Sequence, residues 1–146
     1  MSDFRRVTED FWASPQLAVG DVADARARGF ACLINNRPDG ESADQPDGHA
    51  IEQAARAAGL AYTAIPVTSA GFDEGQVEAM VAALTQSTGP VLAFCRSGTR
   101  STLLWSLAQA SLGRDPDAVA NDAAGAGYDV SPVRPLMDLL ARNRRG

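Results

Sequence analysis

The chain runs from Pro90-Val91-Leu92-Ala93-Phe94 through Cys95-Arg96-Ser97-Gly98-Thr99-Arg100-Ser101 into Thr102-Leu103-Leu104-Trp105-Ser106-Leu107-Ala108. An apolar run, a loop that contains glycine and an amphipathic run indicate a strand, a tight turn and a helix. A loop that enters a helix N-terminus presents backbone N–H groups and the positive end of the helix dipole. The thiol at the start of this loop is therefore a candidate nucleophile for an anion.

The residue types within this loop suit an anionic ligand. Gly98 permits the positive φ or close backbone approach that a curled loop needs, and Arg100 offers a guanidinium fork to a tetrahedral oxyanion. Arginine and a helix N-terminus favour thiolate over thiol at Cys95. We predict that Cys95 is the nucleophile, that Arg100 binds the anion and that Ser101 assists. The remaining loop residues are predicted to bind substrate, namely Arg96, Ser97, Gly98 and Thr99. The alternative is a buried structural cysteine beside an arginine-bearing turn.

The rest of the chain predicts a single α/β domain over residues 1–146. Further strands are predicted at residues 30–34 and 60–65, and helices at 21–28, 49–58, 74–85, from 99 to about 113, from 115 and at 133–142. Strands that alternate with helices indicate a mostly parallel sheet with helices on both faces. Ligands bind beyond the carboxyl ends of such strands. The loops at residues 35–41, 68–73 and 95–101 should therefore converge on one site.

Other side chains in these loops are weaker candidates. Arg37 and Asp39 are predicted to line the substrate entrance, although Pro38-Asp39-Gly40 is equally a good turn. Asp73 is a candidate general acid, with a helix N-cap as the alternative. Cys32 lies in an apolar strand and reads as a buried structural thiol, and a redox partnership with Cys95 would require neighbouring strands.

Composition limits the partners. The 146 residues carry a net charge of −5, and all 13 basic residues are arginine. This balance argues against nucleic acid and against an anionic membrane surface, so we expect a small anionic substrate. One histidine and two separated cysteines make no convincing metal site, and no cofactor is expected. Without a long apolar run or a signal sequence, we expect a cytoplasmic protein with reduced thiols. The oligomeric state stays open.

The cysteine loop resembles that of the cysteine-dependent phosphatases, whose pattern is His-Cys-x-x-Gly-x-x-Arg-Ser/Thr. Residues 11–17, 29–41 and 59–67 agree with this resemblance, and the pieces Asn35-Asn36-Arg37-Pro38-Asp39-Gly40-Glu41 and Cys95-Arg96-Ser97-Gly98-Thr99-Arg100-Ser101 are specific. Together, residues 9–112 are similar to a bacterial family, the beta-lactamase hydrolase-like protein, phosphatase-like domain. The resemblance implies the fold of dual-specificity (protein tyrosine) phosphatases and hydrolysis of a phosphoester through a Cys95 thiol-phosphate intermediate.

Three departures from the phosphatase pattern bear on the reaction. One residue fewer stands between Gly98 and Arg100, which gives Cys-x4-Arg, and Phe94 replaces the histidine. Thr68 and Ser69 stand nearest the position of the general-acid aspartate, and Asp73 comes later. Help from a general acid is worth about 10²–10⁴-fold, so without it only good leaving groups should react well.

The shortened loop leaves two alternatives to phosphoester hydrolysis. Rhodanese-type sulfurtransferases are similar in using a Cys-x4-Arg-like loop, and they form a persulfide without needing a strong acid. A sulfurtransferase with a Cys95 persulfide is therefore one alternative. A non-catalytic anion-binding module is the other, because fold alone does not determine function.

Overall fold

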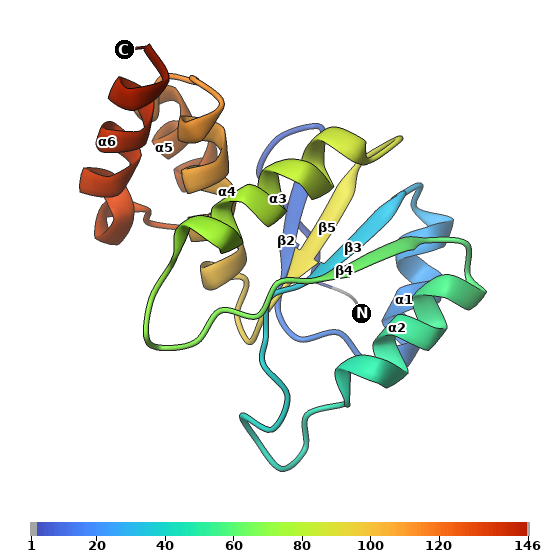
Figure 1. Cartoon of the computed structure of the whole chain (residues 1–146). Helices are drawn as coiled ribbons and strands as arrows, with labels where there is room; N and C mark the ends of the chain where they lie inside the picture. The colour runs from blue at the N-terminus through green and yellow to red at the C-terminus, as the bar shows by residue number, and fades with distance from the viewer. Residues whose placement is uncertain (1–2, 146) are drawn as a thin grey trace.

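The computed structural model describes residues 3–145 and contains a five-stranded sheet in the order β1-β2-β5-β3-β4 (Figure 1). The strands are β1 (Arg5–Arg6), β2 (Phe11–Ser14), β3 (Cys32–Asn35), β4 (Ala61–Ala64) and β5 (Val91–Phe94). Strands β2, β5, β3 and β4 are parallel, and only the edge pair β1–β2 is antiparallel. The strand that leads to Cys95 is thus the central one.

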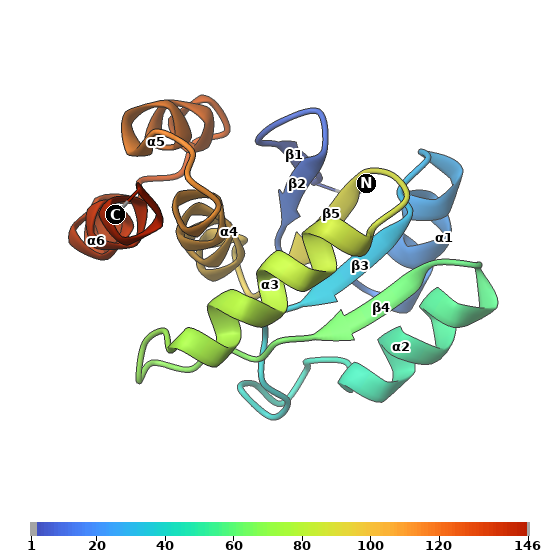
Figure 2. The same cartoon turned by 45° about the horizontal axis from the view of Figure 1, so that its top comes forward.

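Helices cover both faces of this sheet (Figure 2). Helices α1 (Val19–Ala27) and α2 (Gly48–Ala57) lie on one face, and α3 (Glu74–Gln86) and α4 (Thr99–Ser111) lie on the other. After α4 come α5 (Pro116–Gly125), the short 3₁₀ helix η1 (Ser131–Val133) and α6 (Arg134–Arg145), and both α5 and α6 pack against α4. The predicted α/β class, with a mostly parallel sheet covered on both faces, is confirmed.

Side-chain alternation along the central strand explains this layering. Val91 and Ala93 belong to the core under α3 and α4, whereas Leu92 and Phe94 belong to the core under α1 and α2. All four are buried, as expected of a parallel strand with both faces covered. Cys95 follows directly after the last residue of this strand and is also buried.

The differences from prediction are local. Strand β1 has two exposed residues, so its sequence carries no apolar signal, and the segment beginning at Phe11 proves to be a strand parallel to β5. Helix boundaries shift by one to three residues, as they commonly do at frayed ends. The one-domain prediction for residues 1–146 stays a prediction, and its ends at residues 1, 2 and 146 lie outside the described part. Within that part, no helix has the length and hydropathy to cross a membrane.

Candidate active site

The end of β5 places Cys95 at the carboxyl edge of the sheet. Its backbone N–H donates to the Ser14 carbonyl at 3.4 Å, which ties it to the end of β2. The side chain is buried, and Sγ accepts a hydrogen bond from the Gly98 amide at 3.1 Å. The loop therefore curls back on its own sulfur, as its sequence predicted.

The loop leaves several amides open. Gly98 is the N-cap of α4 with φ +92°, and it provides no side-chain cap. Within α4, the Thr99 amide donates to Ser97 Oγ at 3.4 Å, and the first amide with a backbone acceptor is that of Thr102, which donates to the Gly98 carbonyl at 3.0 Å. Four earlier amides have no acceptor among the described residues, those of Arg96, Ser97, Arg100 and Ser101. Such uncapped amides at a helix start form an anion cradle.

The Arg100 guanidinium is oriented by protein acceptors on one side. Its Nη1 and Nη2 donate to the two Glu41 carboxylate oxygens at 2.7 and 2.8 Å, and Nη1 also donates to the Val67 carbonyl at 2.7 Å. Three of the five N–H donors are thereby used. The remaining Nε–H and one Nη2 hydrogen share the opposite edge of the fork. The hydrogen bond to Glu41 raises the pKa of Arg100, and attraction to Cys95 contributes to the same shift.

Glu41 is the main functional residue that sequence reasoning missed. Its carboxylate also accepts from Arg37 Nε at 2.9 Å. The hydrogen bond from Arg100, with a smaller contribution from Arg37, lowers the pKa of Glu41 from 4.5 to about 2. Glu41 is therefore an anion at neutral pH, unsuited to donate a proton. Its position at the end of one of three converging loops was the available signal.

Arg37 and Asp39 both have hydrogen-bond partners within the protein. Beneath the loop, the buried guanidinium of Arg37 also donates to Gln16 Oε1 at 3.1 Å and to Ser42 Oγ at 3.3 Å. These contacts join Arg37 to Glu41 and its neighbours, and its place at the substrate entrance stays a prediction. Asp39 Oδ1 accepts from the Gly48 amide at 2.8 Å, at the first residue of α2. The turn alternative thus describes Asp39 better.

Asp73 is the N-cap of α3. Its Oδ1 accepts from the Gln76 amide at 2.8 Å, and its own amide donates to Gln76 Oε1 at 2.9 Å. This reciprocal pair is a capping box. The geometry favours the N-cap alternative over the predicted general acid.

Other predicted loop residues are distributed around the cradle. Arg96 and Ser97 are exposed, and Ser97 Oγ donates to Thr99 Oγ1 at 3.0 Å. Ser101 Oγ is fully buried without a hydrogen-bond partner among residues 3–145, as is Oδ1 of Asn36. A buried hydroxyl without a partner is costly, so Ser101 is available to a group that enters or forms at the site.

Cys32 is separated from the site although its strand neighbours β5. The β3–β5 register pairs Cys32 with Val91, four positions before Cys95. At about 3.3 Å per residue, this offset is roughly 13 Å, which exceeds the Cα separation that a disulfide spans. Burial raises the pKa of the Cys32 thiol, which fits a structural role. The redox partnership between the two cysteines is thereby ruled out in this fold.

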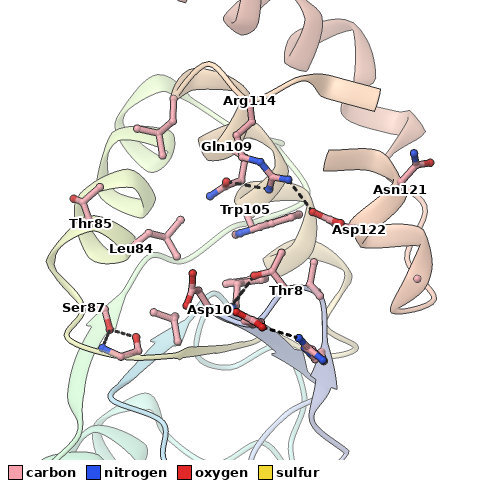
Figure 3. Close-up of a pocket in the computed structure, with 18 of the residues that line it drawn as sticks. Thr8, Asp10, Leu84, Thr85, Ser87, Trp105, Gln109, Arg114, Asn121 and Asp122 are labelled. Carbon is pink, nitrogen blue, oxygen red and sulfur yellow. Dashed lines mark hydrogen bonds and ion pairs between the residues drawn. The ribbon is translucent and has the colours of Figure 1, made fainter. Parts of the chain in front are cut away.

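A cleft of about 1060 Å³ lies at the opposite end of the molecule, beside the amino ends of β2 and β5 (Figure 3). Arg114 crosses it, donating to Asp122 at 2.9 Å and to Gln109 at 3.2 Å above the Trp105 ring. Neither Cys95 nor Arg100 lines this cleft. The candidate nucleophile and its anion donors thus lie outside this cleft. No cluster of metal-ligating side chains occurs within the described residues.

Known proteins resemble this chain in sequence and in fold. A protein named beta-lactamase hydrolase-like protein from Xylella fastidiosa (strain Temecula1) is 42% identical over 108 residues, which cover 74% of this chain and 25% of that protein. The crystal structure of a candidate phosphatase from Neisseria meningitidis Z2491 has 34% identity and a TM-score of 0.80, and covers 93% of this chain and 96% of the other. The structure of Tk-PTP in the active form shares the fold at 14% identity, with a TM-score of 0.73 and coverage of 95% and 96%.

The matched curated relatives are about four times longer than their shared segment. The family model for this segment matches residues 3–112. This range includes the Cys95 loop and the Asn35–Glu41 loop, and the resemblance inferred from the sequence is confirmed. The chain belongs to the family described as beta-lactamase hydrolase-like protein, phosphatase-like domain.

Proposed function

We propose that this domain hydrolyses phosphoesters through a covalent intermediate on Cys95. The observation that carries the proposal is the convergence of donors around one sulfur. The Gly98 amide lies 3.1 Å from Sγ, open amides follow at the start of α4, and the guanidinium of Arg100 attracts the same sulfur. Membership of a phosphatase-like family supports the same class of reaction.

The reaction proceeds in two balanced steps. The Cys95 thiolate attacks phosphorus, an S–P bond forms, and the P–O bond to the leaving alkoxide or aryloxide breaks. Water then attacks phosphorus and the S–P bond breaks. Inorganic phosphate leaves, the proton lost by water passes to phosphate or solvent, and the thiolate is restored.

The cradle stabilises charge on the transferred group. The open amides and the remaining edge of Arg100 are donors for the non-bridging oxygens. Glu41 holds Arg100 from the other side, so that edge does not have to reorganise during the reaction. Arg37 in turn holds Glu41. This chain of contacts supports substrate binding by Arg100 and positioning by Glu41 and Arg37.

The stability of the leaving group as an anion should govern the rate of phosphoester hydrolysis. Asp73 is engaged at the start of α3 and Glu41 is ionised, so neither is arranged to protonate a departing oxygen. We expect aryl phosphates to react well and alkyl phosphates poorly. A substrate whose leaving group is already stable as an anion suits this site.

The shortened loop supports a second candidate, sulfur transfer. Cys-x4-Arg makes a smaller cradle, and sulfite leaves from thiosulfate without an acid. In that reaction the Cys95 thiolate attacks the sulfane sulfur and the S–S bond breaks to release sulfite. Cyanide then removes the sulfane sulfur as thiocyanate. The third possibility is an anion-binding module without turnover.

Paired assays separate these functions. An aryl phosphate and thiosulfate with cyanide are supplied to the wild-type chain and to Cys95→Ser. Phosphate release that is lost in Cys95→Ser is the expected result. Thiocyanate formation without phosphate release would replace the hydrolase with the transferase, and neither activity would contradict both.

A further inference from the structure

Tyr128 reaches the cysteine loop from a segment beyond the family match. It follows α5 in the connection to η1, whereas the match ends at residue 112. Its side chain is buried in the core shared by α4, α5 and α6, and its hydroxyl donates to the Ser97 carbonyl at 3.3 Å. The Arg5 guanidinium lies over its ring, 5.6 Å from the centroid. Tyr128 thus connects the C-terminal helices and β1 to the loop.

The hydrogen bond from the Tyr128 hydroxyl is made to the Ser97–Gly98 peptide, the same peptide that contacts the Cys95 sulfur. The Ser97 carbonyl and the Gly98 amide belong to the same peptide bond, and that amide donates to Cys95 Sγ. A trans peptide is planar, so its C=O and N–H point in opposite directions. Holding the carbonyl on the Tyr128 side therefore aims the N–H at the sulfur. A flip of this unit would lose both hydrogen bonds.

Gly98 fits tightly against the same hydroxyl. A Cβ at position 98 would lie 2.2 Å from the Tyr128 hydroxyl oxygen and 3.0 Å from its Cζ. The loop and the tyrosine therefore match in shape as well as in hydrogen bonding. This fit leaves the peptide little room on the Tyr128 side.

We propose that Tyr128 is a positioning residue for Cys95, which fixes the Ser97–Gly98 peptide so that its amide stabilises the thiolate. The inference rests on the proposed role of Cys95, but its test needs no substrate. The hydroxyl acts as a donor to the carbonyl, and donation to one end of an amide strengthens donation from the other. Tyr128, which lies outside the family match, thereby contributes to the site.

The test measures the pH dependence of Cys95 alkylation by iodoacetamide, followed by mass spectrometry of the Cys95 peptide. Arg100 interacts electrostatically with Cys95, and the variant Tyr128→Phe keeps this arginine. Burial raises the pKa of Tyr128, so it remains a neutral donor across the assay. From the worth of one hydrogen bond, the profile should move to higher pH by about half a unit to one unit.

Tyr62→Phe is the matched control. The hydroxyl of Tyr62 donates to the Gly48 carbonyl at 3.3 Å, as that of Tyr128 donates to a carbonyl, and it also accepts from Asn35 Nδ2 at 3.0 Å. Both variants should lower the melting temperature slightly, but only Tyr128→Phe should shift alkylation. An unchanged profile in Tyr128→Phe, or an equal shift in both variants, would overturn the proposal.

A second readout excludes a role in proton donation. If Tyr128 protonated the leaving group, Tyr128→Phe would slow alkyl phosphates selectively and leave alkylation unchanged. The positioning role predicts an equal decrease, about two- to tenfold from the worth of one hydrogen bond, for aryl and alkyl phosphates. A selective loss would contradict it. Failure of phosphate turnover in the wild-type chain would leave the alkylation result standing as the test.

Discussion

Two loops leave the same edge of the sheet and enter helices on the same face, yet their helix starts are opposite in character. The loop after β5 ends at Gly98, which offers no side chain, and leaves the amides of Arg100 and Ser101 in the first turn of α4 open. The loop after β4 ends at Asp73, whose capping box closes the start of α3. Both are strand-to-helix connections, but only the first presents donors to a ligand.

The contrast shows that an uncapped helix start lacks the stability that a side-chain cap contributes. A side-chain cap is worth about 0.5–2 kcal/mol to a helix. Helix α4 forgoes it and relies on burial, since Leu104, Trp105 and Leu107 are inaccessible. Helix α3 has fewer buried residues, Val77 and Met80, and has the cap. Packing therefore stabilises α4, whereas local hydrogen bonds stabilise the start of α3.

The largest expected effect comes from removing the thiol of Cys95, at the start of the loop after β5. Cys95→Ser should reduce turnover of an aryl phosphate by at least about 10³-fold, because the nucleophile is lost. Cys32→Ala, a buried thiol outside the site, should lower stability and leave kcat close to wild type in folded protein. Steady-state kinetics with both variants checks this. Retained turnover in Cys95→Ser would remove the nucleophile from the account.

Glycines in the two loops allow a matched comparison. Gly98 and Gly71 both have positive φ, +92° and +100°. An alanine at 71 would meet nothing within 4 Å, whereas at 98 it would clash with Tyr128. Both variants should lose about 1–2 kcal/mol from backbone strain, but only Gly98→Ala should lose most activity. Urea denaturation and kinetics measure the two effects. Equal activities would show that the fit at Gly98 is unimportant.

Removing the charge of Glu41 tests the orientation of Arg100. Glu41→Gln should lower kcat/KM by about 10- to 100-fold, since charge-assisted bonds are worth about 1.5–3 kcal/mol. Asp44→Asn, at an exposed acid in the neighbouring segment, serves as the control. A KM that rises together with a falling kcat is expected. Unchanged kinetics would separate Glu41 from the site.

The lowered pKa of Glu41 also predicts that the stability of the fold depends on pH. Because folding lowers its pKa from 4.5 to about 2, its contribution is fully present above pH 4.5 and is lost as the pH falls toward 2. Urea denaturation over this interval should show a steeper loss of stability in the wild-type chain than in Glu41→Gln. Parallel curves would contradict the lowered pKa.

The smallest effect belongs to the capped loop. Asp73→Ala should cost about 1 kcal/mol through loss of the cap, and Asp73→Asn should retain most of that stability because asparagine also caps helices. Neither variant should change kcat for an aryl phosphate by more than a few-fold. Thermal denaturation and kinetics with aryl and alkyl phosphates test this. Selective loss of alkyl phosphate hydrolysis in Asp73→Asn would restore Asp73 as a general acid.

The sequence alone predicted the parts of this comparison that depend on local pattern. Apolar runs and the glycine-bearing loop identified the central strands and the position of Cys95. Strand β1 was missed because its two residues are exposed arginines whose structure depends on pairing with β2. Local pattern cannot reveal such a strand.

The partners of the site residues depend on tertiary structure. Glu41 and Arg100 are 59 positions apart, and Tyr128 is 31 positions from Ser97. No spacing rule connects residues at such separations. Arg37 was placed in the correct loop, but its burial could not be inferred from a turn-like sequence. The sequence thus indicated where the reactive sulfur lies and left open what positions its surroundings.

The most direct test of the central claim is the identity of the group carried by Cys95 during turnover. The wild-type chain is mixed with an aryl phosphate, or separately with thiosulfate, quenched rapidly, and the Cys95 peptide is analysed by mass spectrometry. The account predicts a phosphoryl group on Cys95 after the aryl phosphate. A persulfide after thiosulfate, with no phosphoryl group in the other sample, would contradict it.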